Sequence, residues 1–100
     1  MTMTNDTLSR AFDLTRAMQS AADARDWVRV AALVDERSPL LMNLSGEQTP
    51  EALDRVRQIM AIDASITEHA QTDRDRLAAE FAQSQERIKA ASQYQKAGML

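Results

Sequence analysis

The only histidine, His69, is the side chain in this 100-residue sequence best suited to acid–base or metal chemistry. No residue completes an H-x-x-x-H or E-x-x-H motif around it, and the sequence contains no cysteine. Glu68 and Asp73 are near it in sequence, but acids of this kind are ordinary on helix surfaces. We therefore expect His69 to lie on a solvated helix surface and to bind no metal.

Asp63 is an acid inside an apolar pattern, between Met60 and Thr67. A buried carboxylate is costly unless it is hydrogen-bonded or paired. Asp63 therefore lies either at the solvated edge of the apolar stripe or against a partner, the Trp27 indole N–H or an arginine, that fixes the helix register. No histidine, serine or second acid is arranged around it as a general base would require.

The alternating charges from Asp73 to Arg76 predict a solvated helix face with local ion pairs. Arg74 nevertheless falls on a heptad core position, so the cluster could also mark a boundary between the core and a more mobile tail. Trp27 is predicted to plug the core at the start of a helix. Tyr94, on a polar tail, either packs locally or contacts a partner, because tyrosine is enriched at binding hot spots.

Composition argues against several function classes. Two glycines cannot build a phosphate loop, and the motifs G-x-x-x-x-G-K-[ST], G-x-G-x-x-G and G-x-S-x-G are absent. A net charge of −3 gives no attraction to nucleic acid or to an anionic membrane. No apolar run approaches the roughly 20 residues of a membrane span, and Met1 to Asp6 lack the apolar core of a signal peptide. We expect a cytoplasmic, non-enzymatic protein without a cofactor.

Apolar residues at helical spacing, with only two glycines and two prolines, predict an all-α fold. We expect an antiparallel bundle of three to four helices in a single domain, residues 1–100. Helices are predicted over residues 6–24, 26–44 and 51–96. Residues 84–100 could form a separate C-terminal helix.

Local signals define the ends of these helices. Asp26 is a good N-cap for the second helix, and Gly46 can end it in the left-handed conformation. Pro39 is predicted to kink that helix near residues 35–38, with two short helices as the alternative. Thr49 can cap the third helix, and Pro50 suits its first turn.

The third helix is longer than its expected partners. Residues 51–96 would span about 70 Å and each earlier helix only about 30 Å, at a rise of about 1.5 Å per residue. The excess could fold back after a break near residues 83–85, pair with another subunit, or accept a foreign helix. The apolar residues of this helix are predicted to form a heptad-like stripe, which consists of Leu53, Val56, Met60, Thr67, Ala70, Leu77, Phe81, Ile88 and Ala91.

Several short motifs, taken in order, resemble the FliT family of flagellar export chaperones over nearly the full length. These motifs are Asp26-Trp27, Glu36-Arg37 followed by Leu40-Leu41, Ile59-x-x-x-Asp63-x-x-Ile66, Arg76-Leu77-x-x-Glu80 and the tail AASQYQKAG around Tyr94.

The resemblance implies a small helical bundle in the bacterial cytoplasm that binds the C-terminal helical segment of the filament-cap protein FliD. Such a chaperone keeps FliD unassembled and delivers it to the type III export apparatus. Some members also bind the export ATPase or the flagellar master regulator. A tyrosine in the last helix of family members docks to the export-gate protein FlhA, and Tyr94 matches it by position.

A chaperone that binds a helix in a groove needs an apolar face wider than its own core can cover. We expect that face on the second and third helices, although its residues could instead thicken an ordinary core. The predicted client-binding residues are Leu33, Leu40, Met42, Ile59, Ile62 and Ile66. The alternative function is a structural or regulatory module that self-associates through residues 70–97 as a coiled-coil homodimer.

Overall fold

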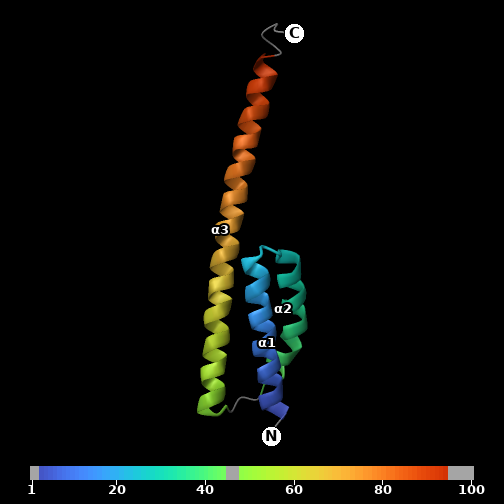
Figure 1. Cartoon of the computed structure of the whole chain (residues 1–100), viewed down its shortest axis with the longest axis vertical. Coiled ribbons are helices and arrows are strands. Elements are labelled where there is room, and N and C mark those ends of the chain that lie inside the picture. The colour runs from blue at the N-terminus through green and yellow to red at the C-terminus, as the bar shows by residue number, and fades with distance from the viewer. Residues whose placement is uncertain (1–2, 45–47, 95–100) are drawn as a thin grey trace. The chain divides into compact units, whose positions relative to one another are not determined.

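The computed structural model describes residues 3–44 and 48–94, with side chains from Asp6 onward. Within these ranges the chain forms three helices and no strand: α1 (Met3–Asp23), α2 (Trp27–Met42) and α3 (Pro50–Tyr94) (Figure 1). The all-α prediction is confirmed. The predicted helix end at Gly46 lies outside the described residues.

A tight turn connects α1 to α2. Arg25 has a left-handed φ of 60°, which lets the Asp26 N–H donate to the Ala21 carbonyl (2.8 Å) and the Arg25 N–H to the Ala22 carbonyl (3.0 Å). These two bonds satisfy carbonyls at the end of α1 in the manner of a Schellman motif. Asp26 then caps α2, as predicted, because its carboxylate accepts from the Arg29 N–H at 3.1 Å.

Both prolines lie within helices. Pro50 is the first residue of α3, and the Thr49 hydroxyl accepts from the Ala52 N–H at 3.1 Å, so the predicted cap is confirmed. Pro39 lies inside α2, which continues through it to Met42. The alternative of two short helices is therefore wrong.

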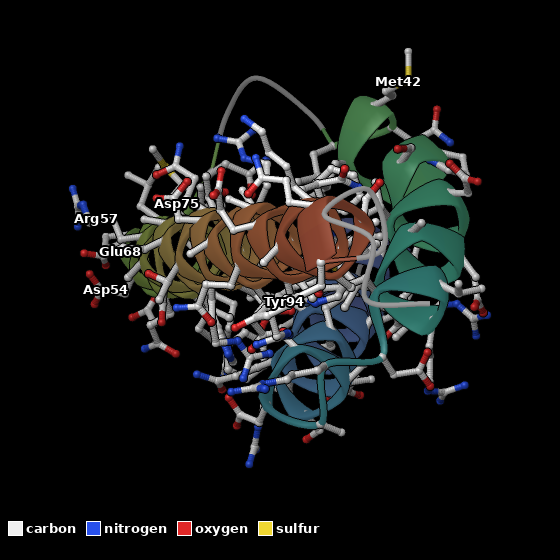
Figure 2. All side chains as sticks on the ribbon, turned by 90° about the horizontal axis from the view of Figure 1, so that it is seen from above. Met42, Asp54, Arg57, Glu68, Asp75 and Tyr94 are labelled. Carbon is white, nitrogen blue, oxygen red and sulfur yellow. The ribbon has the colours of Figure 1, made fainter. Side chains whose placement is uncertain are left out.

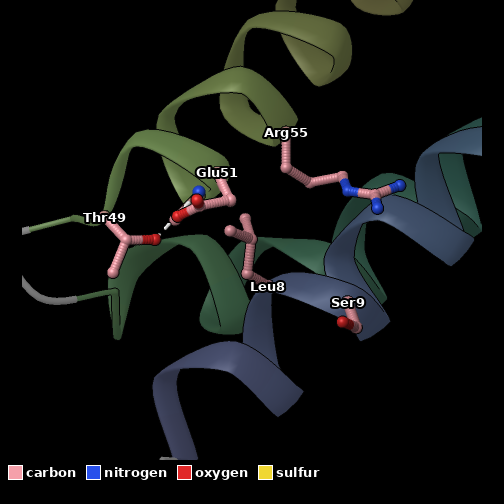
Figure 3. A pocket seen from close by; sticks show the side chains of 6 residues that line it. Leu8, Ser9, Thr49, Glu51 and Arg55 are labelled. Carbon is pink, nitrogen blue, oxygen red and sulfur yellow. Dashed lines mark hydrogen bonds between the residues drawn. The ribbon is translucent and has the colours of Figure 1, made fainter.

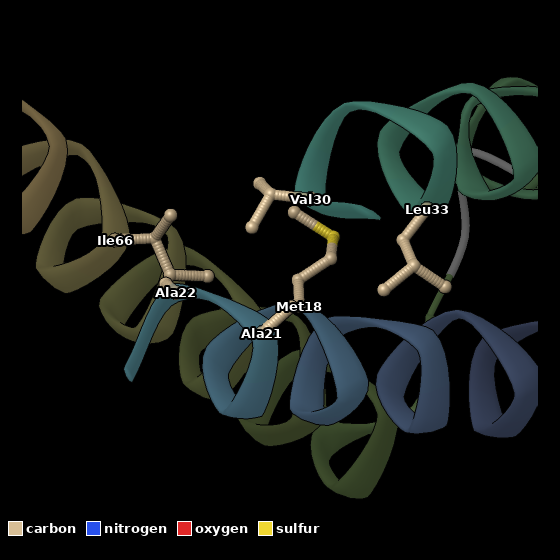
Figure 4. Packing of buried hydrophobic residues seen from close by; sticks show 6 residues of the cluster. All are labelled: Met18, Ala21, Ala22, Val30, Leu33 and Ile66. Atoms are coloured by element: carbon tan, nitrogen blue, oxygen red, sulfur yellow. The ribbon is translucent and has the colours of Figure 1, made fainter. Parts of the chain in front are cut away.

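The chain divides into two compact units, residues 1–69 and 70–100. In the first unit, two apolar clusters join all three helices. One cluster contains Met18, Val30 and Ile66 (Figure 4), and the other contains Leu8 and Ile59. Early α1 residues pack with late α2 residues and early α3 residues, so α2 runs antiparallel to α1 while this part of α3 runs parallel to it.

The buried line of α3 differs from the predicted stripe. Ala52, Ile59 and Ile66, seven residues apart, are buried, whereas Leu53 and Met60 are exposed. Neighbouring residues of a helix differ in direction by about 100°. The predicted stripe began at Leu53, the larger side chain, and therefore followed the wrong face of α3. The small Ala52 allows α1 to approach closely, and periodicity alone did not favour it.

The second unit contains the continuation of α3 from Ala70 to Tyr94. The helix is continuous across residues 83–85, where one expectation placed a break. From Arg74 to Tyr94 every residue is exposed except Ser84, which is half-buried. No described helix combines the length and apolarity that crossing a membrane requires.

Candidate functional site

Arg37 links the three helices of the first unit. Its Nη1 donates to the Thr15 hydroxyl on α1 (2.9 Å) and to the Asp63 carboxylate on α3 (2.8 Å). Thr15 in turn donates to the Ala11 carbonyl at 2.8 Å. Arg37 is only 8% exposed, and its Nε has no hydrogen-bond partner among the described residues. A buried guanidinium depends on such partners, so this pairing fixes the helices in register.

Two alternatives were left open for Asp63, the edge of the apolar stripe or a paired position, and the structure shows both. Its side chain is 35% exposed, at the edge of the core, and it pairs with an arginine. The expectation that Asp63 has an arginine partner is confirmed, and its role in fixing the helix register stays an interpretation. The sequence did not identify Arg37, although a charged residue seven positions after the buried Val30 was the available signal.

A cleft of about 300 Å³ opens beside this ion pair, between α2 and α3. Val30 and Val34 of α2 and Ile66 of α3 line it, so its lining is largely apolar. Arg37 and Asp63 add one cation and one anion. The remaining lining residues are Met18 and Thr67.

A second hollow of about 360 Å³ lies between α1 and the start of α3, where Leu8, Thr49 and Arg55 contribute to its wall (Figure 3). The Thr49 hydroxyl in this wall is already used by the helix cap. The Arg55 guanidinium lies 4.3 Å from the centre of the Phe12 ring, a cation–π contact. These groups are engaged in holding the helices, and the arrangement indicates no chemistry.

His69 is not the solvated residue that we expected. It is half-buried, and its ring meets Trp27 edge-on, with centroids 5.4 Å apart and planes at 83°. Trp27 packs against the first apolar cluster. An apolar face on His69 explains the error, because an imidazole can bury its ring edge against an aromatic side chain. No group of three or more metal-ligating side chains occurs among the described residues.

The charged cluster of the second unit is solvated only in part. Arg76 pairs with Asp73 at 2.8 Å and, more loosely, with Glu80 at 3.9 Å, so the predicted local ion pairs are confirmed. Asp73 itself is buried, which corrects the prediction of a solvated face. It lies seven residues after Ile66 and so continues the buried repeat of Ala52, Ile59 and Ile66. The predicted stripe followed another face of α3 and therefore did not include this repeat.

The family described as "Flagellar protein FliT" matches residues 5–96, which include the whole cleft and Tyr94. The chain belongs to the FliT family. The resemblance seen in the sequence is thereby confirmed, and membership makes this a flagellar protein of a chaperone family. The chain has no significant match among curated proteins or among solved structures.

The predicted client-binding residues of this FliT-family chain do not form one exposed patch. Leu33, Ile59 and Ile66 are buried in the first unit's own core, and of these only Ile66 also lines the cleft. Leu40 and Ile62 are half-buried and pack against the two clusters. Met42 is 83% exposed and points outward from the end of α2 (Figure 2).

Tyr94, the predicted contact for the export gate, is the last residue of α3 and is 67% exposed. It belongs to the second unit, whereas all the predicted client-binding residues belong to the first. The two predicted roles are therefore assigned to different units of the chain.

Proposed function

We propose that this FliT-family protein is a cytoplasmic export chaperone that binds the C-terminal helical segment of the filament-cap protein FliD. Binding would prevent premature assembly of FliD and present it to the flagellar type III export apparatus. The observation that carries the proposal is the cleft between α2 and α3, within a chain that matches its family over residues 5–96. The protein would do this without catalysis and without a cofactor.

The size and lining of the cleft suit a helix presented by another protein. At about 300 Å³ it is at the lower end of ligand pockets, so it would take one or two apolar side chains of the client. Ile66 and Val34 supply a firm apolar lining, and Met18 can adapt its shape to different anchors. An amphipathic helix placing such anchors on one face is the standard occupant of this kind of groove.

Arg37 and Asp63 would orient the client helix, which the apolar lining alone would bind without a fixed direction. A client side chain that accepts or donates a hydrogen bond could meet one of these groups at the wall of the cleft. A client in the wrong register would cover the part-exposed Asp63 carboxylate without offering it a further hydrogen bond, which is costly in a desolvated interface. Met42, exposed at the end of α2, is proposed as an outer contact along the same client.

The assignment of the cleft as the client site can be tested with a substitution that obstructs the cleft at its exposed edge and leaves the buried core unchanged. Thr67 lines the cleft and is exposed, so Thr67→Arg should leave the fold intact and obstruct client entry. Ser65→Arg adds the same side chain at an exposed position that does not line the cleft. We expect calorimetric affinity for a FliD C-terminal peptide to fall about tenfold or more for Thr67→Arg only. Equal affinities for the two variants would exclude this cleft.

We propose that Tyr94 contacts the export-gate protein FlhA, and that the export ATPase or the flagellar master regulator are further partners. A large amphipathic side chain exposed at the end of a helix is well suited to anchor such a contact. In a pull-down, Tyr94→Ala should retain FliD and lose FlhA. Loss of both partners, or of neither, would contradict a separate role for Tyr94.

A further inference from the structure

The outer face of α2, which takes no part in the two apolar clusters of the first unit, is almost free of charge. Val28 is 84% exposed and Met42 is 83% exposed, and the residues between them on this face are exposed as well. The outer face consists of Val28, Ala31, Ala32, Asp35, Pro39 and Met42. The solvated side of a helix normally carries polar and charged residues, whereas here Asp35 is the single charge in an apolar row. Such a row marks a contact surface.

Asp35 lies at the middle of the outer face and lacks a local partner. Val28 and Met42 stand seven residues before and seven residues after it, so the three residues form nearly one line along the helix. None of the residues three or four positions away from Asp35 in α2 is basic, so an ion pair along the helix is not open to it. By contrast, the exposed Asp54 pairs with Arg57 at 3.0 Å. The Asp35 carboxylate is therefore accessible to a cation from outside the helix.

Pro39 adds a second hydrogen-bond acceptor at the same residue. Proline has no N–H, so the carbonyl one turn earlier, which is that of Asp35, lacks the donor that would continue the helical hydrogen-bond ladder. Asp35 thus offers both its carboxylate and its main-chain carbonyl to a partner. An arginine guanidinium carries several N–H groups in one plane and can donate to two acceptors at once, so it suits this pair better than a lysine ammonium does.

The central place of Asp35 argues against a second copy of this chain on the outer face. Because Asp35 is midway between Val28 and Met42, pairing the face with itself in either direction, with the apolar ends in register, would bring two Asp35 carboxylates together. Like charges that meet across an interface repel each other, and the same charge disfavours an anionic membrane or nucleic acid. The occupant must bring a cation to Asp35 and apolar side chains to both sides of it.

We propose that the outer face of α2 binds an amphipathic helix of another protein, in which one arginine is flanked on both sides by large apolar residues. The arginine donates to the carboxylate and the carbonyl of Asp35. The small side chains of Ala31 and Ala32 let the second helix approach closely, and larger residues of the partner fill the space above them. Val28 and Met42 cover the ends of the contact, which is about 21 Å long at a rise of about 1.5 Å per residue.

This surface is distinct from the cleft proposed for the client, because none of its residues lines that cleft. The partner is therefore additional to the client. Met42 is also proposed as an outer contact of the client, so it is left unchanged in the test.

A synthetic helix of about 20 residues serves as the probe, since shorter helices are marginal in water. The peptide carries arginine at its centre and leucine three, four and seven positions away on either side, and a second peptide has glutamate in place of the arginine. Fluorescence anisotropy of each labelled peptide, titrated with the full chain, gives its affinity. We expect the arginine peptide to bind at least about tenfold more tightly than the glutamate peptide.

Variants of Asp35 test which residue reads the peptide charge. Asp35→Arg should reverse the preference, and Asp35→Asn, which removes the charge and keeps the size, should abolish most of it. Asp13→Arg makes the same charge change as Asp35→Arg at an exposed position of α1 and should leave the preference as it is in the wild type. Circular dichroism checks that each variant keeps its helix content.

Equal affinities for the two peptides, or a preference that both Asp35 variants retain, would overturn the proposal. An amphipathic peptide could instead enter the cleft between α2 and α3, and Thr67→Arg separates the two sites because Thr67 lines the cleft only. The affinity for the arginine peptide should be the same in Thr67→Arg as in the wild type, and its loss would also overturn the proposal. These measurements contain no FliD, so their outcome is independent of whether the client binds in the cleft.

Discussion

Arg37 connects three helices through its hydrogen bonds, which restricts how far the helices can shift relative to one another. It is buried, its Nη1 serves both Thr15 and Asp63, and its Nε has no partner in the described part of the chain. The desolvation cost of such a cation is recovered only while its partners remain. The pair is therefore better evidence for a fixed register than for a large gain in stability.

Because Arg37 is more deeply buried than Asp63, we expect removal of either residue to lower the free energy of unfolding by a different amount. Asp63→Ala leaves the Arg37 guanidinium buried without its anion and should lower the free energy of unfolding by about 3 kcal/mol. Arg37→Met removes the charge itself, keeps the apolar stem and leaves Thr15 bonded to Ala11, so it should cost less, about 1 kcal/mol. Urea unfolding of both variants measures the difference, and a larger cost for Arg37→Met would contradict this account.

Sequence reasoning reached only part of this site. It recognised that Asp63 interrupted an apolar stripe and allowed for an arginine partner, because a buried acid requires one. It did not select Arg37 from the arginines of the chain, since the seven-residue spacing from Val30 was its only signal, and it did not identify Thr15, whose contact depends on how α1 and α2 pack. Likewise, the exposure of Met42 and the burial of Leu33 follow from the phase of α2 against its neighbours.

The helices themselves were predicted well, because their ends depend on local chemistry. Asp26, Thr49 and Pro50 act where their side chains or rings satisfy a helix terminus, and those interactions need no tertiary information. The face of α3 was predicted badly, because choosing between Ala52 and Leu53 depends on how closely α1 approaches. The larger side chain favoured Leu53 in the prediction, whereas in the structure Ala52 is the residue that packs in the core.

Pro39 gives a prediction at the scale of one element. It is exposed inside α2, where its nitrogen cannot donate to the carbonyl one turn earlier. Pro39→Ala should stabilise the chain by about 1–3 kcal/mol, the helix gain being reduced by a more flexible unfolded state. Pro50→Ala is the matched control, because Pro50 opens α3 and displaces no helical hydrogen bond, so its effect should be close to zero. Equal effects in urea unfolding would contradict this reasoning.

The whole chain consists of two units whose stability has different sources. Residues 1–69 contain two apolar clusters and the Arg37 network, whereas α3 from Arg74 to Tyr94 has no buried residue. Most helical stability in proteins comes from packing of an apolar face, and this segment of α3 buries none within the described chain. The second unit therefore depends on whatever covers Leu77, Phe81 and Ile88.

This difference predicts that heating unfolds the chain in two phases. Trp27, the only tryptophan, lies in the first unit and reports its unfolding by fluorescence, while circular dichroism reports helix in both units. The helical signal should begin to fall at a lower temperature than the Trp27 transition. Coincident transitions would instead mean that the chain unfolds as one cooperative unit, with α3 stabilised along its length from within the chain.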